Sequence, residues 1–259
     1  MRIAMGVEYS GSDFCGWQLQ VGVRTVQEEI EKAISYVANH GVRVICAGRT
    51  DTGVHAYGQV IHFDTDAQRD KSSWLMGCNA NLPGDVSVNW VSIVDTGFHA
   101  RFSASRRRYR YVIFNRNVRP SVLANLVAWE YRALDEARMF EASRCLLGEH
   151  DFSSYRTVHC QAKSPVRTVH QLDIYRHGEY VVIDIEANAF LHHMVRNIAG
   201  VLMAIGAGDQ DISWASEVLA CRDRLLGGVT ASPRGLYLIN VIYPDEFSIP
   251  GMEYMPFPG

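Results

Sequence analysis

The first 95 residues alternate between two patterns of apolar and polar positions. Residues 2–9 alternate apolar with polar or small side chains, which predicts a strand. From Val26 to Val37 apolar residues recur at helical spacing, so we predict a helix that begins at the capping-box pair Thr25 and Glu28 and ends at Gly41. The same patterns predict strands over 42–46, 59–63 and 86–94 and a helix over 71–79. The predicted order is βαββαβ.

The second half of the chain repeats this order with longer connections. Residues 166–175 and 180–186 are predicted to form a hairpin across His177-Gly178. The other predicted elements are strands over 106–114 and 236–243 and helices over 135–147, 190–207 and 213–220. We therefore expect an α+β fold of two ferredoxin-like halves, with one continuous, mostly antiparallel sheet and helices packed on one side. The expected divisions are 1–104, 105–245 and a tail over 246–259.

Composition places the chain among ordinary globular proteins. Of its 259 residues 47% are hydrophobic and 20% are charged, and the six cysteines show no close pair, which excludes a disulfide framework and a structural zinc site. Residues 1–10 lack a signal-peptide pattern, and the most apolar stretch, 198–208, is too short to cross a bilayer. We expect a cytoplasmic protein with no membrane contact.

Charge is distributed unevenly along the chain. Residues 101–119 contain seven arginines and no acidic residue, so this segment carries +7 while the net charge is −3 and the rest carries −3 minus 7, or −10. A basic stripe on an acidic body attracts phosphates to one place, as a nucleic-acid-binding protein requires.

A dense group of small and polar residues lies between two predicted strands. The segment 47–55 reads Ala-Gly-Arg-Thr-Asp-Thr-Gly-Val-His. By spacing alone Asp51 closes an ordinary polar turn or belongs to a functional site, and both interpretations are open, because Asp and Gly are common turn residues and loops on a rigid sheet carry function.

This segment, continuing to Gly58-Gln59-Val60, resembles the signature loop of the tRNA pseudouridine synthase A family, which modifies the anticodon stem-loop. Further segments resemble family segments in the family's order, so the resemblance covers the chain essentially from end to end. They are Gly11 to Gln20, Asn79 to Pro83, Phe98 to Ala104, Arg107 to Tyr111 and His192 to Asn197.

The resemblance implies an isomerase that converts uridine to pseudouridine at positions 38–40 of the tRNA anticodon stem-loop, in a catalytic cleft between the two halves. Asp51 is implied as the nucleophile. The reaction needs no redox cofactor, ATP or metal, and we expect none. The resemblance also implies a homodimer in which one tRNA touches both subunits.

Two further catalytic residues are implied by the resemblance. Arg196 lies off the apolar stripe of its predicted helix, which by pattern alone indicates a solvated arginine, but the family arginine at this place pairs with the catalytic aspartate. Tyr109 by pattern alone packs in a sheet, with Arg108 and Arg110 on the opposite face. By resemblance Tyr109 stacks on the target base and accepts the C5 proton.

The remaining implied contacts concern substrate binding. Arg49 is implied to contact the RNA backbone or to fill the space left by the flipped uridine. Arg107 and Arg108 are expected to bind phosphates. Leu236, beside Tyr237, is implied to line the pocket, although a core position fits it equally well.

Two other functions compete with this one. A non-catalytic RNA-binding module on the same fold would tolerate the loss of Asp51. A metal-dependent hydrolase would use the histidines, but their spacing matches no common ligand pattern. The candidates are His192 and His193 with His55, His62 and His99.

Overall fold

The computed structural model describes residues 1–157, 160 and 162–251, and these form two compact units. Unit 1 comprises Met1–Ser105 together with 237–251, and unit 2 comprises Arg106–Leu236. The boundary between the units falls between Ser105 and Arg106, and the strand residues after Leu236 cluster with unit 1.

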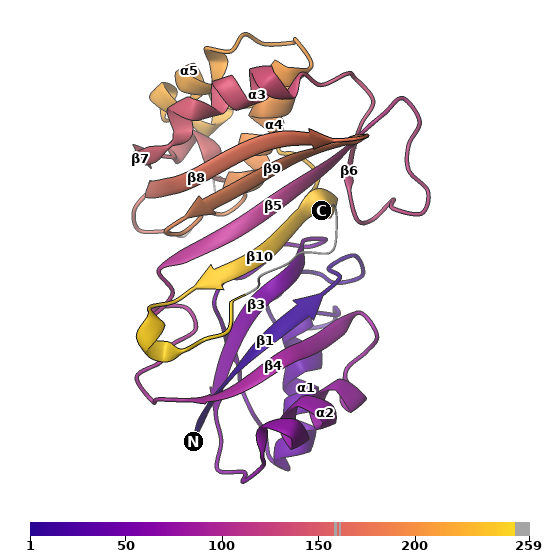
Figure 1. Ribbon diagram of the computed structural model, residues 1–259, viewed down its shortest axis with the longest axis vertical. Coiled ribbons are helices and arrows are strands. Elements are labelled where there is room, and N and C mark those ends of the chain that lie inside the picture. Colours follow the sequence, from indigo (N-terminus) through magenta and orange to yellow (C-terminus); the bar gives the residue numbers. More distant parts are fainter. Residues whose placement is uncertain (158–159, 161, 252–259) are drawn as a thin grey trace. The chain divides into compact units, whose positions relative to one another are not determined.

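Unit 1 has the predicted βαββαβ order. Its sheet runs β4-β1-β3 with β2 beside β3, and these pairs are antiparallel, which is the ferredoxin-like arrangement. Helices α1 and α2 lie together in Figure 1, and Trp74 of α2 meets Phe63 of the sheet at 5.5 Å between ring centroids. The bounds are β1 Arg2–Tyr9, α1 Val26–Ala38, β2 Ile45–Cys46, β3 His55–Asp64, α2 Lys71–Asn81 and β4 Val86–Val94.

The capping box predicted at the start of α1 is wrong. The Thr25 side chain makes no capping hydrogen bond. Instead the carbonyls of Gly16 and Trp17 accept from the amides of Val26 and Gln27 at 3.3 and 3.0 Å. The first turn of the helix is therefore satisfied by a distant backbone segment.

The helix end and the next strand also differ from the prediction. Helix α1 ends before Asn39, whose φ of 59° is left-handed, and not at Gly41. The predicted strand over 42–46 shortens to Ile45–Cys46, while β3 begins at His55, four residues earlier than predicted. Strand β10, Leu236–Ile242, runs parallel to β3 and pairs Tyr237 with His55.

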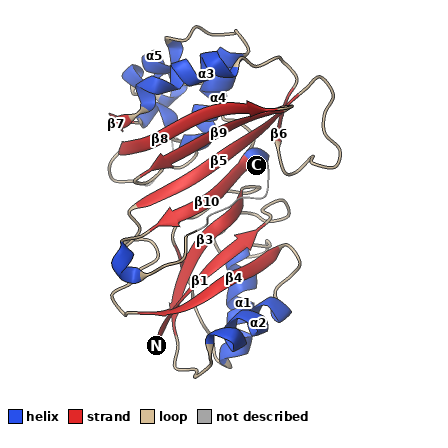
Figure 2. Cartoon of the chain, in the orientation of Figure 1, coloured by secondary structure: helices blue, strands red, loops and turns tan. Residues whose placement is uncertain are grey.

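Unit 2 contains an antiparallel sheet in the order β5-β9-β8-β7, with β6 parallel beside β5. The predicted hairpin is confirmed as β8 and β9. Figure 2 shows the helices α3, α4 and α5 gathered on one side of β8 and β9. The bounds are β5 Arg106–Asn115, β6 Ala128–Glu130, α3 Glu136–Ser143, β7 Gly148–Asp151, β8 Val166–His177, β9 Tyr180–Ala187, α4 Met194–Gly206 and α5 Trp214–Cys221.

The helix predicted over 190–207 begins four residues late, at Met194. His193 precedes it with a φ of 63°, a left-handed conformation that cannot continue a right-handed helix. Apolar periodicity does not reveal this break, because Phe190 and Leu191 continue the apolar pattern. Among the described residues, none of the helices combines the length and apolarity that crossing a membrane would require.

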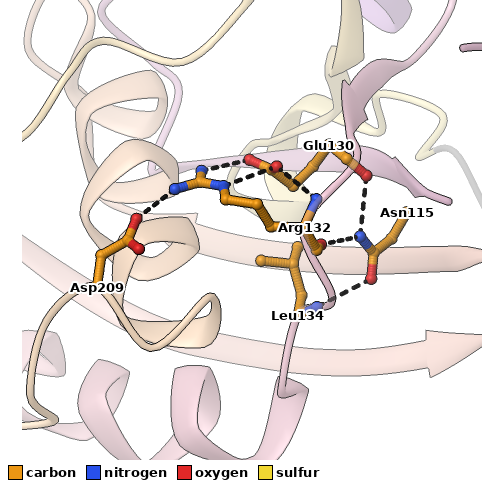
Figure 3. Close-up of polar contacts among 5 residues, drawn as sticks. All are labelled: Asn115, Glu130, Arg132, Leu134 and Asp209. Atoms are coloured by element: carbon orange, nitrogen blue, oxygen red, sulfur yellow. Dashed lines mark hydrogen bonds and ion pairs between the residues drawn. The ribbon is translucent and has the colours of Figure 1, made fainter. Parts of the chain in front are cut away.

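A polar network fixes the connection from β6 to α3, as Figure 3 shows. The Asn115 side chain donates to the carbonyls of Glu130 and Arg132 at 2.9 and 2.6 Å and accepts from the Leu134 amide at 3.1 Å. Arg132 pairs with Glu130 and Asp209. Burial alone would raise the pKa of Glu130, but the hydrogen bonds from Arg132 hold that pKa below its usual value. The network joins this connection to the segment after α4.

His62 is a buried imidazole on β3 that makes stability depend on pH. Its Nδ1 accepts from the Ala100 amide at 3.1 Å. Burial, with the neighbouring His99 and the charge of Arg2, lowers the pKa of His62 to about 4, although Asp64 opposes this. Between this value and about 6.5 the unfolded chain binds more protons. Lowering the pH through that range should therefore cost up to about 3 kcal/mol of unfolding free energy.

Urea unfolding at pH 7.5 and 4.5 measures this dependence. His62→Gln should reduce the difference in unfolding free energy between the two pH values, because glutamine keeps a hydrogen-bond acceptor but does not titrate. His170→Gln, which changes an exposed histidine, serves as the control and should leave the loss as in the original protein. An equal loss in all three proteins would contradict the role assigned to His62.

Candidate active site

The loop that carries Asp51 lies in unit 1 between β2 and β3. The amide of Ala47 donates to Val60 at 2.8 Å, and the amide of Val54 donates to the Asp51 carbonyl at 3.1 Å. Gly53 completes the turn with a φ of 78°, which favours glycine. Asp51 is half-buried at this tight turn.

Buried side chains fix the loop on both sides of Asp51. The Thr50 hydroxyl lies 2.7 Å from the Tyr9 hydroxyl, and the Thr50 carbonyl accepts from the Trp17 amide at 3.0 Å. The Gln59 side chain donates to the Gly48 carbonyl at 2.6 Å and accepts from its amide at 3.4 Å. Thr50 is 7% and Gln59 0% exposed, so these bonds are shielded from water. The backbone at Asp51 is thus held rigidly, as a catalytic group requires.

Two glycines let the segment after β1 approach this loop closely. Gly16 has a φ of 81°, and a Cβ there would lie 2.9 Å from the Thr50 carbonyl oxygen. A Cβ at Gly11 would lie 2.0 Å from the carbonyl oxygen of Val54. The Gly11 amide also donates to His55 Nδ1 at 3.1 Å. The glycines of this segment therefore have a packing function.

Gly11→Ala should displace the loop, because backbone atoms of Val54 cannot yield to a methyl group as a flexible side chain would. We expect the unfolding free energy to fall by about 1–3 kcal/mol, and the Val54 amide to exchange hydrogen faster. Gly84→Ala is the control, since no atom lies within 4 Å of a Cβ there. Equal stability and exchange in the two variants would contradict the packing role.

Arg49 is exposed, two residues before Asp51. Burial raises the pKa of the nearby Cys46 thiol to about 12, against the opposing charge of Arg49. A buried, neutral thiol is a poor nucleophile, so Cys46 is not a candidate for that role. The implied contact of Arg49 with RNA stays a prediction.

Tyr109 lies on β5 of unit 2, with 9% of its surface exposed. Its neighbour across the strand pair is Ile185. Phe190 meets the Tyr109 ring edge to face, with centroids 5.0 Å apart and planes at 81°. This packing sets the plane of the tyrosine ring.

The strand neighbours of Tyr109 are ion-paired. Arg108 donates to both carboxylate oxygens of Asp184, at 2.6 and 2.9 Å, and Arg110 donates to the same carboxylate at 2.9 Å. Arg106 pairs with Glu186 at 3.0 Å. The alternation that places Arg108 and Arg110 away from Tyr109 therefore agrees with the prediction.

The arginines of the basic stripe have acidic partners on a neighbouring strand. The segment 101–119 contains no acid, but its strand neighbour β9 supplies Asp184 and Glu186. Asp184 is only 3% exposed, so its negative charge lies beneath two guanidinium groups. A charge count along the chain cannot show which acids a neighbouring strand brings. The only signal along the chain was Asp184 within the apolar run 181–185, followed by Glu186.

Arg196 lies in the first turn of α4 and is half-buried. Its Nε donates to the Ala231 carbonyl at 2.8 Å, and the Ala231 amide donates to the Arg196 carbonyl at 3.1 Å. Burial raises the pKa of Tyr111, and the nearby charge of Arg196 opposes that rise. Arg196 is thus a positioned group and not a solvated one.

The remaining expected residues divide between the units. Asp51 and Arg49 belong to unit 1, and Tyr109 and Arg196 to unit 2 together with Arg107, Arg108 and Leu236. Leu236 is 6% exposed at the start of β10, which suits a core position and a pocket wall equally. His192 and His193 were predicted to lie within the helix over 190–207. In the structure they precede α4.

Comparison with known proteins identifies the family of this chain. Residues 5–103 and 142–244 match the family model described as tRNA pseudouridine synthase. The protein named tRNA pseudouridine synthase A from Shewanella frigidimarina is 54% identical over 99% of this chain and 98% of its own length. The proteins of that name from Pseudomonas aeruginosa and Escherichia fergusonii are 59% and 56% identical, each over 96% of this chain and over 88% and 92% of their own lengths.

Among solved structures, a chain in the crystal structure of a Cbf5-Nop10-Gar1 complex matches 93% of this chain and 50% of its own, with a TM-score of 0.42 and 11% identity. That likeness is too distant to bear on fold or function. The extent and identity of the sequence matches are decisive, because they include the Asp51 loop and both strands beside it. The chain belongs to the tRNA pseudouridine synthase family.

Proposed function

We propose that this protein isomerises uridine to pseudouridine at positions 38–40 of the tRNA anticodon stem-loop, with Asp51 as the nucleophile. The observation that carries the proposal is the family match over the Asp51 loop, together with the buried hydrogen bonds that hold that loop. A half-buried carboxylate on a fixed turn suits a group that must be aimed at one atom of a bound nucleotide.

The reaction transfers the ribose C1′ bond from N1 to C5 of the same uracil ring. The N1–C1′ bond breaks, the C5–C1′ bond forms, the proton leaves C5, and N1 gains a proton, so nothing is oxidised or reduced. Asp51 would hold or stabilise one fragment while the base turns over. The target base must leave the stack to rotate, and Arg49 would contact the RNA backbone or fill the vacated space.

Tyr109 and Arg196 complete the proposed site. Tyr109 would stack on the uracil and accept the C5 proton through its hydroxyl, in the plane set by Phe190. Arg196 would pair with the Asp51 carboxylate and keep it ionised. Leu236 would line the pocket. These roles are consistent with the positions of Tyr109 and Arg196 on rigid elements of unit 2.

Release of tritium tests the proposed reaction directly. A tRNA transcript labelled with tritium at C5 of uridine loses the label to water when C5 forms its new bond. The purified protein should release label in proportion to the pseudouridine that chromatography detects. Tight binding without release would support the non-catalytic RNA-binding module instead.

The two arginines of the proposed tRNA contact should behave differently. Arg107 donates to the Asn188 carbonyl at 3.0 Å, whereas Arg108 is bound twice by the buried Asp184. Arg107→Gln should therefore reduce the slope of log Kd against log salt by about one phosphate contact, with little change in stability. Arg108→Gln should lower the unfolding free energy by about 1–3 kcal/mol, with a smaller change in slope.

Filter binding of tRNA between 50 and 200 mM salt and urea unfolding, each on both variants, measure these effects. Equal changes in the salt slope and in the unfolding free energy of the two variants would contradict the different roles that the contact with Asp184 predicts for Arg107 and Arg108.

A cytoplasmic homodimer that binds one tRNA across both subunits is also part of the proposal. This part of the proposal rests on the family resemblance. We expect light scattering to give the molecular mass of two chains. A single-chain mass at assay concentrations would exclude the shared binding surface.

A further inference from the structure

Phe102 is a large aromatic residue of unit 1 whose side chain is exposed to solvent. Its exposed fraction is 75%, and it lies on the turn between β4 and β5, in the family-like segment Phe98 to Ala104. A single exposed apolar residue needs no explanation by itself. The turn that carries Phe102 is unusual, however, because hydrogen bonds fix its backbone and so the position of the ring.

His99 organises this turn. Its Nδ1 accepts from the amides of Arg101 and Phe102, at 3.2 and 3.1 Å. The His99 amide donates to the Ser103 hydroxyl at 3.0 Å, and the Ser103 amide donates to the His99 carbonyl at 2.9 Å. Burial and the charge of Arg2 lower the pKa of His99, which favours the neutral imidazole that this acceptor role requires. The segment is a closed, preorganised turn.

Three rings form a line of contacts from the core to the surface, and the outer pair, His99 and Phe102, is stacked. His62, buried on β3, lies 4.7 Å from His99. His99 in turn stacks on Phe102, with centroids 4.4 Å apart and planes at 28°. The exposed Arg101 guanidinium lies 5.4 Å from the Phe102 centroid. The outermost ring of the stack thus carries a cation beside it.

We propose that Phe102, with Arg101, is a stacking site for an unpaired nucleobase of the RNA substrate. A fixed aromatic ring beside a guanidinium offers a base a π-face and its phosphate a positive charge, the combination that single-stranded nucleic-acid sites use. The inference rests on the proposed function for the presence of an RNA substrate. It adds a base-binding role for residues other than Asp51, Tyr109 and Arg196.

The test uses the full-length protein and an anticodon stem-loop RNA that carries 2-aminopurine at one unpaired loop position at a time. The second probe, the paired hairpin, has the same stem closed by a flexible glycol linker, so that it contains no unpaired base. Phe102→Ala should weaken stem-loop binding by at least about fivefold, because each stacked base contributes about that much or more. The salt slope should stay unchanged, since no charge is lost.

Matched variants separate stacking from other effects. Phe102→Trp should keep the affinity and the fluorescence change of the 2-aminopurine that stacks. Tyr36→Ala removes an aromatic ring of similar exposure, 74%, from α1 and should leave binding unaltered. The affinity for the paired hairpin should be the same in all variants.

Three results would overturn the inference. One is stem-loop binding by Phe102→Ala equal to that of the original protein. Another is an equal loss for the paired hairpin. The third is a changed molecular mass for Phe102→Ala in light scattering, which would mean that a second copy covers the ring. Tritium release by the original protein is measured in parallel, so failure of the stacking site is distinguished from failure of the proposed reaction.

Discussion

Replacing Asp51 with alanine should abolish pseudouridine formation while tRNA affinity changes little. The loss should be at least about 10³-fold in turnover, because no other group can replace a nucleophile and members of a catalytic unit are not additive. The fold should persist, since the loop is held by Tyr9, Trp17 and Gln59 and not by the Asp51 side chain alone.

Asp51→Asn provides the sharper comparison, because the amide has nearly the same shape without the charge. Asp13→Asn, at an exposed carboxylate of the same unit, is the control and should retain full turnover. Single-turnover rates and Kd values for one tRNA transcript should be measured on all four proteins. Full turnover by Asp51→Ala would remove Asp51 from the mechanism.

Tyr109→Phe should lower kcat by about 10²–10⁴-fold, the usual contribution of a positioned acid or base. The Kd for tRNA should stay nearly constant, because the ring that stacks on the uracil and packs on Phe190 is retained. A plain packing role for Tyr109, the alternative that its strand pattern left open, predicts no loss in kcat.

Tyr175→Phe is the matched control for Tyr109→Phe. Tyr175 is a half-exposed tyrosine on β8, near Arg110 and Asp184. It should show original values of kcat and Kd. Single-turnover release of tritium from C5 reports the affected step, and an unchanged release rate in Tyr109→Phe would assign the C5 proton to another acceptor.

Local periodicity was sufficient for most of the secondary structure. Strands β1 and β4 have the predicted bounds, and α2 begins at Lys71 as predicted, because Asp70 caps it through the Ser73 amide. Each of these elements is specified by residues within its own length. The ferredoxin-like order of unit 1 follows from their succession.

Contacts that these elements make with distant residues were not predicted. The start of α1 is satisfied by Gly16 and Trp17 and not by Thr25. The final strand lies with unit 1, because Tyr237 pairs with His55, far away in sequence. Such partners are determined by tertiary structure, so no window along the chain contains them.

For the candidate site, the sequence indicated the central residue but not the residues that support it. Composition and spacing left Asp51 undecided between a turn and a site, and the family resemblance singled it out. The supporting residues were not identified, since the roles of Gln59 beneath the loop and of Asp184 beneath Arg108 depend on contacts across strands. The sequence therefore indicated the catalytic candidates but not the contacts that hold them in place.

Position-resolved mapping tests the central claim most directly. An unmodified tRNA transcript with uridines at positions 38, 39 and 40 is incubated with the protein and with Asp51→Asn, and pseudouridine is located by chemical modification and primer extension. We expect new stops at these positions with the original protein and none with Asp51→Asn. Pseudouridine elsewhere, none at all with the original protein, or equal stops with both proteins would contradict it.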